Sequence, residues 1–331
     1  MNNSFQLKPL SEIIDFKNGK AIKTSNGNIP IYGGNGILGY TNDSNYVNNL
    51  IIGRVGAYCG SVHLSIGKCW VSDNAIAGEA KENTNLLFAY YLLKSLNLNQ
   101  KQVGSSQPLL TQGILNHIYV HIPEDKTTQQ KIALVLSTLD EKIALNNQIN
   151  ATLEQMAKTL YDYWFVQFDF PDENGKPYKT SGGEMVYNET LKRDIPKGWE
   201  VKDLGSIAHL YQPQTLSESD LLGDGKYLVY GANGIIGRYD KFNHEKPMVT
   251  ITCRGNTCGN INITMPFSWI TGNAMVVNPK NEVYGIDYLN NLLSHSKLSN
   301  TITGSAQPQI TRTNLAPLTI IDPVIDIIEK Y

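Results

Sequence analysis

The glycine-rich stretch IYGGNGILGY, residues 31–40, is the first segment whose composition could support chemistry. Glycines placed just before a helix can hold a phosphate group through backbone N–H groups. No helical pattern follows this stretch closely, and its Asn-Gly step favours the positive φ angles of a tight hairpin turn. We therefore predict a strand–turn–strand element here, with a phosphate-binding loop as the alternative.

The sequence lacks the usual signatures of catalysis. It has no N/D-P-P-Y/F motif of an adenine methyltransferase, because Asn278-Pro279 is followed by Lys280. It also has no P-loop and no G-x-S-x-G nucleophile elbow. The segment PDENGK, residues 171–176, superficially resembles a nuclease motif but lies in a turn-rich region. These absences favour a non-catalytic role.

The residue types that bind metals are scattered along the chain. The cysteines form no C-x-x-C pair, no histidine follows them at zinc spacing, and we expect buried thiols and no metal site. The cysteines are Cys59, Cys69, Cys253 and Cys258. The histidines, which form no obvious ligand set, are His63, His117, His121, His209, His244 and His295.

Composition indicates a folded protein of two ordinary domains and a connector. The chain has 331 residues, of which 41% are hydrophobic and 18% charged. Its net charge of −2 argues against a polycation but permits a local basic groove. No apolar run approaches the ~20 residues that a membrane span needs. Because the N-terminus also lacks a secretion signal, we predict a cytoplasmic protein without membrane partners.

Six sequence blocks recur in the same order, so the sequence predicts two copies of one mixed α/β domain, at 1–125 and 199–323. Five matching pairs are FQLKPLSEI and WEVKDLGSI, YGGNGILG and YGANGIIG, WVSDNA and WITGNA, GSSQPLLT and GSAQPQIT, and Ile122-Pro123 and Asp322-Pro323. In the sixth, GRVGAYCG aligns with CRGNTCG after one gap, which places Arg54 opposite Arg254.

The segment between the copies, residues 126–168, contains no glycine or proline and predicts one long helix. Asn146 and Asn150 interrupt an apolar seam in its middle, as in coiled coils whose buried Asn fixes the register. Roughly 37 helical residues would form a rod of about 55 Å. An ordinary core helix is the alternative, and we expect residues 169–198 to form an exposed linker. The seam consists of Ile132, Leu136, Leu139, Ile143, Leu153, Leu160 and Trp164.

The repeated blocks, the helix QQKIALVLSTLDEKIALNNQINATLEQMAKTLYDYWF and the segment IPKGWEVKDLGSIA together resemble the specificity subunit of a Type I restriction–modification enzyme. The resemblance covers nearly the whole chain. It implies an α+β fold in which two target recognition domains, joined by a long coiled-coil-type helix, each read one half of a split DNA site.

The resemblance also implies partners that carry the chemistry. Modification subunits, two per complex, would methylate adenine at N6 with S-adenosylmethionine, and a restriction subunit would translocate and cleave DNA with ATP and Mg²⁺. We expect no catalytic residue, cofactor or metal on this chain. The alternatives are an assembly module that does not read DNA productively, and a stand-alone nuclease or methyltransferase.

In the family pattern a second long helix follows the second domain and covers the seam of the first helix. Here residues 324–331 look like only the start of that second helix. We therefore expect the apolar seam of the first helix to pair with a second copy of the chain, a modification subunit or a separately encoded fragment.

Two domains that read different half-sites need different side chains at matching places. We therefore take residues shared by both copies, such as Trp70 and Trp269, mainly as scaffold, and residues that differ as candidates for base choice. The shared arginines and glutamines stay candidates for DNA contact, because Arg binds guanine or phosphate and Gln pairs with adenine. The candidate DNA-binding residues of the first copy are Asn35, Tyr40, Arg54, Tyr58, Ser106, Gln107 and Gln112. Those of the second copy are Asn233, Arg238, Arg254, Asn256, Gln307, Gln309 and Arg312.

Overall fold

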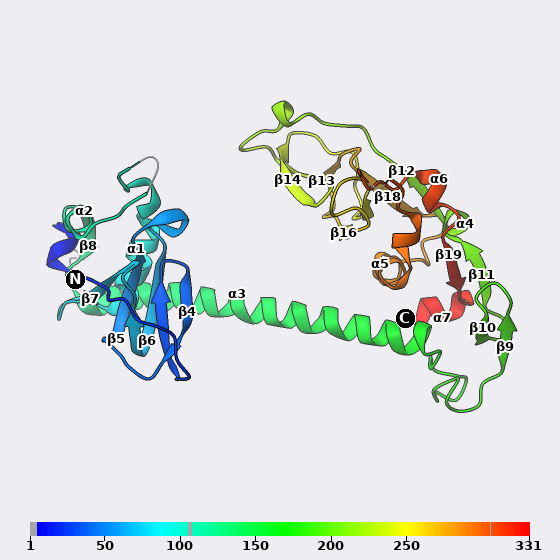
Figure 1. The fold of residues 1–331 in the computed structure, drawn as a ribbon, viewed down its shortest axis with the longest axis horizontal. Coiled ribbons are helices and arrows are strands. Elements are labelled where there is room, and N and C mark those ends of the chain that lie inside the picture. Colours follow the sequence, from blue (N-terminus) through cyan, green and yellow to red (C-terminus); the bar gives the residue numbers. More distant parts are fainter. Residues whose placement is uncertain (1–4, 105–107, 305) are drawn as a thin grey trace. The chain divides into compact units, whose positions relative to one another are not determined.

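The computed structural model describes residues 5–104, 108–304 and 306–331 (Figure 1). The chain divides into two compact units, Met1–Gln148 and Ile149–Tyr331. Both units combine small sheets with helices, so the predicted α+β class is confirmed. In the described part of the chain, no helix is long and apolar enough to cross a membrane.

The first unit is built on a six-stranded sheet in the order β2-β7-β5-β6-β3-β4, with β1 and β8 paired separately. Helix α1 packs on this sheet, and its Phe88 and Leu93 join Leu50 and Ile52 in the core. The strands are β1 (Phe5–Pro9), β2 (Ile14–Asn18), β3 (Ile29–Gly33), β4 (Gly36–Thr41), β5 (Tyr46–Gly53), β6 (Val62–Val71), β7 (Ala75–Ala80) and β8 (Tyr119–Pro123). The helices and 3-10 turns are η1 (Leu10–Glu12), η2 (Gly56–Tyr58), α1 (Leu86–Ser95), η3 (Leu98–Gln100) and α2 (Gln112–Asn116).

The second unit contains the sheets β12-β18-β15-β16, β14-β13-β17, β11-β19 and β10-β9. Its strands are β9 (Met185–Asn188), β10 (Arg193–Pro196), β11 (Glu200–Asp203), β12 (Ala208–Tyr211), β13 (Tyr227–Gly231), β14 (Gly234–Tyr239), β15 (Val249–Thr252), β16 (Ile261–Ile263), β17 (Trp269–Ile270), β18 (Ala274–Pro279) and β19 (Thr319–Asp322). Its helices and turns are α4 (Leu204–Ile207), η5 (Glu218–Asp220), α5 (Ile286–His295), η6 (Leu298–Thr301), α6 (Arg312–Leu315) and α7 (Ile325–Lys330).

The two strand orders describe one fold twice, as the repeated blocks predicted. The order β2-β7-β5-β6-β3-β4 becomes β12-β18-β15-β16 followed by β17-β13-β14, because the long strand β6 is replaced by the two short strands β16 and β17. The parallel pairing of Ile31 with Trp70 recurs between Val229 and Trp269. We use domain 1 for residues 1–125 and domain 2 for residues 199–323.

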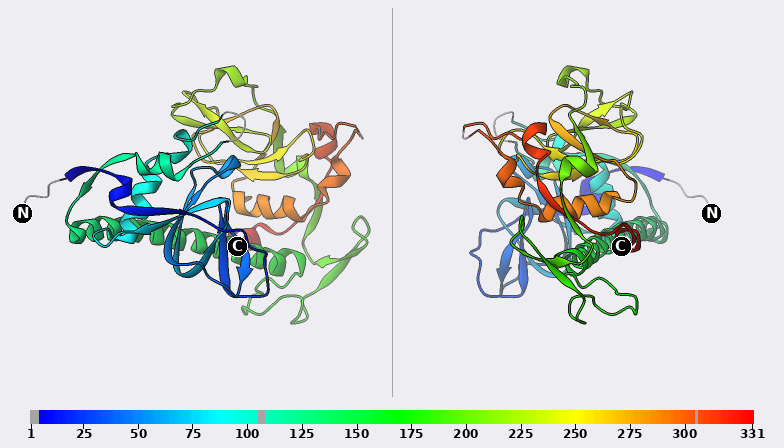
Figure 2. Two further views of the ribbon diagram at one scale, coloured as in Figure 1. Left: turned by 60° about the vertical axis from the view of Figure 1, so that its left-hand side comes forward. Right: turned by 90° about the vertical axis from the view of Figure 1, so that its right-hand side faces the viewer.

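Helix α3 (Lys126–Tyr161) is continuous over 36 residues and passes into a π-helical turn, η4 (Asp162–Val166) (Figure 2). The Asp125 carboxylate begins the helix by accepting hydrogen bonds from the backbone N–H groups of Thr127 at 3.1 Å and Thr128 at 3.0 Å. The Thr128 hydroxyl and these N–H groups lower the pKa of Asp125. The first turns of α3 contact domain 1, where the Tyr91 hydroxyl donates a hydrogen bond to Asp140 at 2.9 Å.

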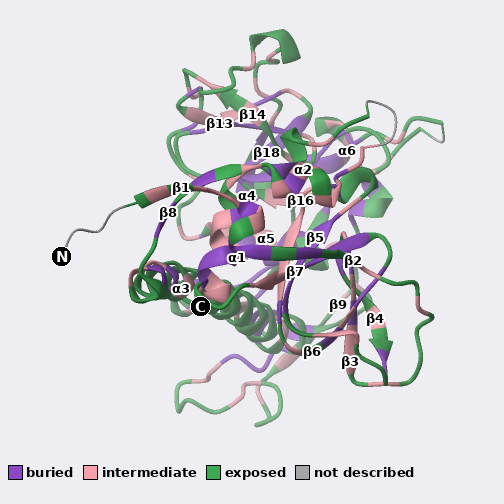
Figure 3. Ribbon diagram, turned by 90° about the vertical axis from the view of Figure 1, so that its left-hand side faces the viewer, coloured by how far each residue is buried: buried purple, intermediate pink, exposed green. Residues whose placement is uncertain are grey.

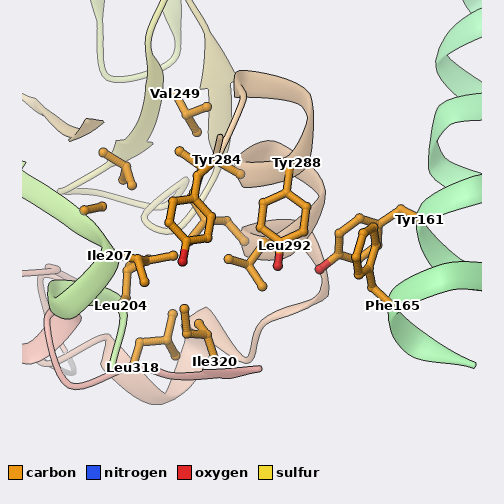
Figure 4. Close-up of a cluster of buried hydrophobic side chains, with 14 of the residues drawn as sticks. Tyr161, Phe165, Leu204, Ile207, Val249, Tyr284, Tyr288, Leu292, Leu318 and Ile320 are labelled. Atoms are coloured by element: carbon orange, nitrogen blue, oxygen red, sulfur yellow. The ribbon is translucent and has the colours of Figure 1, made fainter. Parts of the chain in front are cut away.

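An aromatic cluster joins the C-terminal end of α3 to the core of the second unit (Figure 4). The Phe165 ring lies with its centroid 5.0 Å from Tyr161, 5.1 Å from Tyr288 and 5.1 Å from Tyr331. The Tyr331 hydroxyl also donates to the carbonyl of Ala157 at 3.1 Å. The end of α3 is therefore part of a packed core.

Residues 169–198 differ from the exposed linker that the sequence predicted. They contain the hairpin β9–β10, and they bury Phe170 and Ile195. Buried Asp169 accepts hydrogen bonds from the N–H group of Thr180 at 2.7 Å and its hydroxyl at 2.6 Å, and these bonds lower the pKa of Asp169 against its burial. The turn-forming composition was recognised correctly, but aromatic residues between the turns fold the segment back onto the core.

One buried carboxylate distinguishes domain 2 from domain 1. Asp322 on β19 accepts hydrogen bonds from the Lys202 ammonium at 2.6 Å and the Tyr284 hydroxyl at 2.7 Å. The Asp322 hydrogen bond raises the pKa of Lys202, and burial raises the pKa of Tyr284. Buried Ile122 holds the corresponding place on β8, so domain 1 closes the same point with an apolar side chain.

Candidate nucleic-acid interface

The glycine-rich stretches form two-residue hairpin loops in both domains, as predicted. Gly33 pairs with Gly36 across the first turn, and Gly231 pairs with Gly234 across the second. The positive φ angles fall on the glycines that begin β4 and β14, 89° at Gly36 and 103° at Gly234, and not on the asparagines before them. Asn35 and Asn233 are exposed at the two tips. A phosphate-binding loop would need a helix directly after the glycines. Strands flank both sides of each turn, so this alternative is wrong.

Three segments of domain 1 meet beside the hairpin tip, and we call their described residues loop cluster 1: residues 34–36, residues 54–61, and residues 103–104 with 108–112. The Gly34 carbonyl accepts a hydrogen bond from the Ser61 hydroxyl and lies 3.1 Å from His63 Nε2. The loop after β5 is held to the third segment by backbone bonds. Gly56 N–H donates to Pro108 at 3.2 Å, and Leu110 N–H donates to Arg54 at 2.9 Å.

The same three segments meet in domain 2, and their described residues form loop cluster 2: residues 232–234, residues 253–260, and residues 303–304 with 306–312. The Ala232 carbonyl at the turn accepts hydrogen bonds from the Thr252 hydroxyl and, at 3.4 Å, from the Asn262 amide. Gly255 N–H donates to Pro308 at 3.1 Å, and Ile310 N–H donates to Cys253 at 2.9 Å. The two clusters therefore share one backbone framework.

This framework corrects the predicted pairing of Arg54 with Arg254. The carbonyl that accepts from the third segment belongs to Arg54 in domain 1 but to Cys253 in domain 2. In both domains the next residue forms an antiparallel β-bridge with the third segment. This residue is Val55 in domain 1 and Arg254 in domain 2. The correct alignment has no gap here. The gapped alignment maximised identity, whereas the hydrogen bonds show that the two arginines occupy different positions.

The corrected positions give the two arginines different surroundings. Arg54 is half-buried, and its Nε atom is buried without a hydrogen-bond partner in the described part of domain 1. Arg254 is exposed and has no ion pair among the residues that the structure describes. The Arg254 guanidinium is therefore available to a ligand.

The other predicted residues divide between the loop clusters and the far end of the hairpin. Gln112 and Arg312 are truly equivalent, since each is the first residue of a short helix capped by a threonine. Tyr58 in cluster 1 and Asn256 in cluster 2 are exposed, as are Gln307 and Gln309. Ser106 and Gln107 lie outside the described residues.

Tyr40 and Arg238 occupy equivalent positions, opposite Pro30 and Leu228, but lie at the other end of the hairpin. Arg238 donates to the carbonyl of Gly225 at 3.3 Å. They share a hairpin with the loop clusters but are not brought into them. Sequence reasoning missed Val55, Val103 and Thr303, and only the backbone pairing identifies these three residues as cluster members.

Some residues shared by the copies make contacts within their own domain. Tyr32 and Tyr230 each accept a backbone hydrogen bond from the strand beside the hairpin, at 2.8 and 2.9 Å. The Trp70 indole donates to the carbonyl of Lys20 at 2.7 Å.

The cysteines are unpaired thiols. Burial raises the pKa of Cys59, Cys69 and Cys258, and that of Cys253 to about 11. Over the described residues, no group of three or more His, Cys, Asp or Glu side chains could hold a metal ion.

The predicted seam of α3 is exposed from Leu136 to Leu160 and half-buried at Ile132, and most of the helix is exposed (Figure 3). Leu139 is 52% exposed, Ile143 58% and Leu153 56%, and Leu136 and Leu160 are also exposed. Ile132 packs partly against the core of domain 1. Trp164 was wrongly assigned to the seam, because it is 8% exposed and belongs to the core of the second unit. The π-helical turn adds a residue to the turn and rotates Trp164 off the seam.

The profile of the Type I restriction modification DNA specificity domain matches residues 2–155 and 196–328. The chain belongs to this family. The two matched regions contain the two loop clusters, so the structural duplication and the sequence profile agree. Among solved structures, a Type I restriction–modification S subunit from M. genitalium shares the fold, with a TM-score of 0.62 and 20% identity over 99% of this chain and 87% of that chain.

Curated specificity subunits are similar over shorter stretches. The MjaIX specificity subunit of Methanocaldococcus jannaschii is 38% identical over 124 residues, which are 36% of this chain and 26% of that protein. The EcoprrI specificity subunit of Escherichia coli is 34% identical over 112 residues, which are 34% of this chain and 28% of that protein. These matches cover well under two thirds of either relative.

Proposed function

We propose that this specificity-family chain is the DNA-recognition subunit of a Type I restriction–modification complex. Each loop cluster reads one half of a bipartite DNA sequence, and partner subunits carry out the chemistry. The observation that carries this proposal is that one backbone framework occurs twice with different side chains at equivalent points, such as Val55 and Arg254, or Gln112 and Arg312. Two readers of different half-sites need this combination.

The distribution of arginine supports a nucleic-acid ligand for domain 2. Its only arginines are Arg238, Arg254 and Arg312. All three lie on the hairpin or in loop cluster 2, and none has an ion pair in the described part of the chain. Arginine suits this place because its planar fork hydrogen-bonds phosphates and base edges.

A net charge of −2 supports the idea that other subunits supply much of the phosphate contact, because affinity for duplex DNA depends largely on neutralised phosphates. The proposed partners are two modification subunits, which bind S-adenosylmethionine and methylate adenine at N6, and a restriction subunit that uses ATP and Mg²⁺. On this proposal the chain itself is non-catalytic, binds no cofactor and works in the cytoplasm, where the DNA is.

The exposed apolar residues of α3 support pairing with a helix of another chain. Leu134, Val135, Leu145, Ile149 and Met156 are exposed beside the seam, so apolar surface extends around much of the helix. Exposed apolar patches of this kind are typical of interaction surfaces. A second copy of the chain, a modification subunit and a separately encoded fragment are the three occupants to be compared.

The decisive experiment maps the adenines that the chain methylates together with its modification subunits on DNA containing random sequence. The proposal expects a bipartite motif with one adenine target in each half. Replacing Arg312 in loop cluster 2 by alanine is expected to relax or weaken only the half-site read by domain 2. A continuous motif, or equal loss in both halves, would contradict reading by separate domains.

A further inference from the structure

Each loop cluster contains a row of three residues whose backbones pair directly. In domain 1 Leu109 lies between Val55 and Val103, and in domain 2 Gln309 lies between Arg254 and Thr303. Directly opposed residues of an antiparallel pair place their side chains on the same face, about 4.5–5.5 Å apart at Cβ. Each row is therefore one small continuous surface.

The rows occupy the same place in the two domains. Both rows are flanked by the same two backbone hydrogen bonds, from Gly56 and Leu110 in domain 1 and from Gly255 and Ile310 in domain 2. The chemistry of the rows is nevertheless opposite. One is wholly apolar, and the other combines a guanidinium, a carboxamide and a hydroxyl group.

The polar row has free hydrogen-bonding groups. Arg254, Gln309 and Thr303 are all exposed, and across the described residues the side chains of Arg254 and Gln309 have no hydrogen bond or ion pair. Arginine forms paired hydrogen bonds with O6 and N7 of guanine, and glutamine forms them with N6 and N7 of adenine. Side by side, these two groups can read adjacent base edges.

The apolar row leaves hydrophobic side chains exposed to solvent, which does not stabilise the folded domain. Val55 is 40% exposed and Val103 is 52% exposed, with the half-buried Leu109 between them. Among the base edges in the major groove, only thymine presents a methyl group, and apolar side chains contact it. Such a row disfavours guanine, cytosine and adenine because it leaves the hydrogen-bonding groups of their edges unpaired and finds no methyl group to contact.

We propose that these rows determine the base preference of the two domains, an inference that rests on the proposed function. The row Arg254–Gln309–Thr303 selects guanine in the half-site of domain 2 through the Arg254 fork. The row Val55–Leu109–Val103 selects thymine in the half-site of domain 1 through methyl contact.

The test exchanges the rows and reads the methylated motif of the complete complex on randomised DNA. In the first variant, Arg254→Val, Gln309→Leu and Thr303→Val are combined. The preference for guanine in the half-site of domain 2 is expected to fall roughly 5- to 150-fold, which corresponds to one bidentate base contact. The half-site of domain 1 is expected to stay unchanged. The single substitution Arg254→Val is expected to show the same loss and serves if the triple variant does not fold.

The reciprocal variant combines Val55→Arg, Leu109→Gln and Val103→Thr, and it is expected to replace thymine by guanine preference in the half-site of domain 1 alone. Arg193→Val, which removes an arginine from strand β10 outside loop cluster 2, is the matched control and is expected to leave the motif unchanged.

The outcomes separate this inference from the proposed function. A wild-type complex without a bipartite motif overturns both. A wild-type bipartite motif that survives the exchanges overturns the inference alone. A uniform loss of methylation with an unchanged motif also overturns it, because it makes Arg254 a phosphate contact.

Discussion

The attachment of α3 to the core of the second unit rests on Phe165, and its removal gives a prediction that can be quantified. Phe165 is 5% exposed, and Tyr161, Tyr288 and Tyr331 surround its ring at centroid distances of 5.0–5.1 Å. Truncating a buried phenylalanine to alanine destabilises a protein by about 3–5 kcal/mol. The neighbours come from three separate segments, so the cavity cannot close by a shift of one element. We expect Phe165→Ala to reach this range.

Hydrogen exchange measured by mass spectrometry on the full chain can locate this loss. Protection of amides in α5 is expected to fall roughly 150-fold or more, up to the limit set by global unfolding. Protection in α1 of the first unit is expected to stay unchanged. Tyr163→Ala, two residues away and 38% exposed, is the control and should cost less than about 1 kcal/mol. Equal effects of the two substitutions, or loss of protection in α1, would refute the reasoning.

Three further predictions concern other parts of the molecule. Leu139→Asp combined with Leu153→Asp is expected to abolish pairing of α3 with another helix. The melting temperature should stay unchanged because both residues are exposed. If the wild-type chain sediments as a monomer and gains no mass with modification subunits, this prediction is wrong. Asp322→Asn is expected to lower the unfolding free energy by about 1–3 kcal/mol in urea titration, because the buried Tyr284 hydroxyl and the half-buried Lys202 ammonium lose a charged acceptor. An unchanged midpoint would contradict this. Burial lowers the pKa of His244, so below a pH of about 6.5 the unfolded chain binds more protons than the folded chain, and stability should fall as the pH drops. His244→Gln should flatten the dependence of the melting temperature on pH. An unchanged slope would show that His244 does not cause this dependence.

The duplication and the hairpins could be predicted from sequence because each depends on local signals. Asn-Gly steps in matched blocks specify turns, and residues such as Trp70 and Trp269 mark the same strand in both copies. The helix start at Lys126 was also predicted correctly from a segment without glycine or proline, and in the structure Asp125 caps this end of the helix.

Two errors have a common physical cause, which is that sequence periodicity and identity do not record backbone geometry. A heptad count carried through Tyr161 places Trp164 on the seam, but a π-helical turn changes the helical phase there. Matching Arg54 to Arg254 likewise required a gap that the backbone bonds do not contain. Without the gap Val55 aligns with Arg254, so the apolar row of domain 1 corresponds to the polar row of domain 2.

The backbone bonds that hold the loop clusters have a consequence for how such a protein can evolve. Gly56 and Pro108, like Gly255 and Pro308, are joined through main-chain atoms, so the side chains of the adjoining row contribute little to folding. Substitutions at Val55 or Arg254 should therefore be nearly neutral for stability. An evolving lineage could change the DNA sequence that it prefers by single mutations. No variant along the way would need to be less stable, and the other domain would need no matching change.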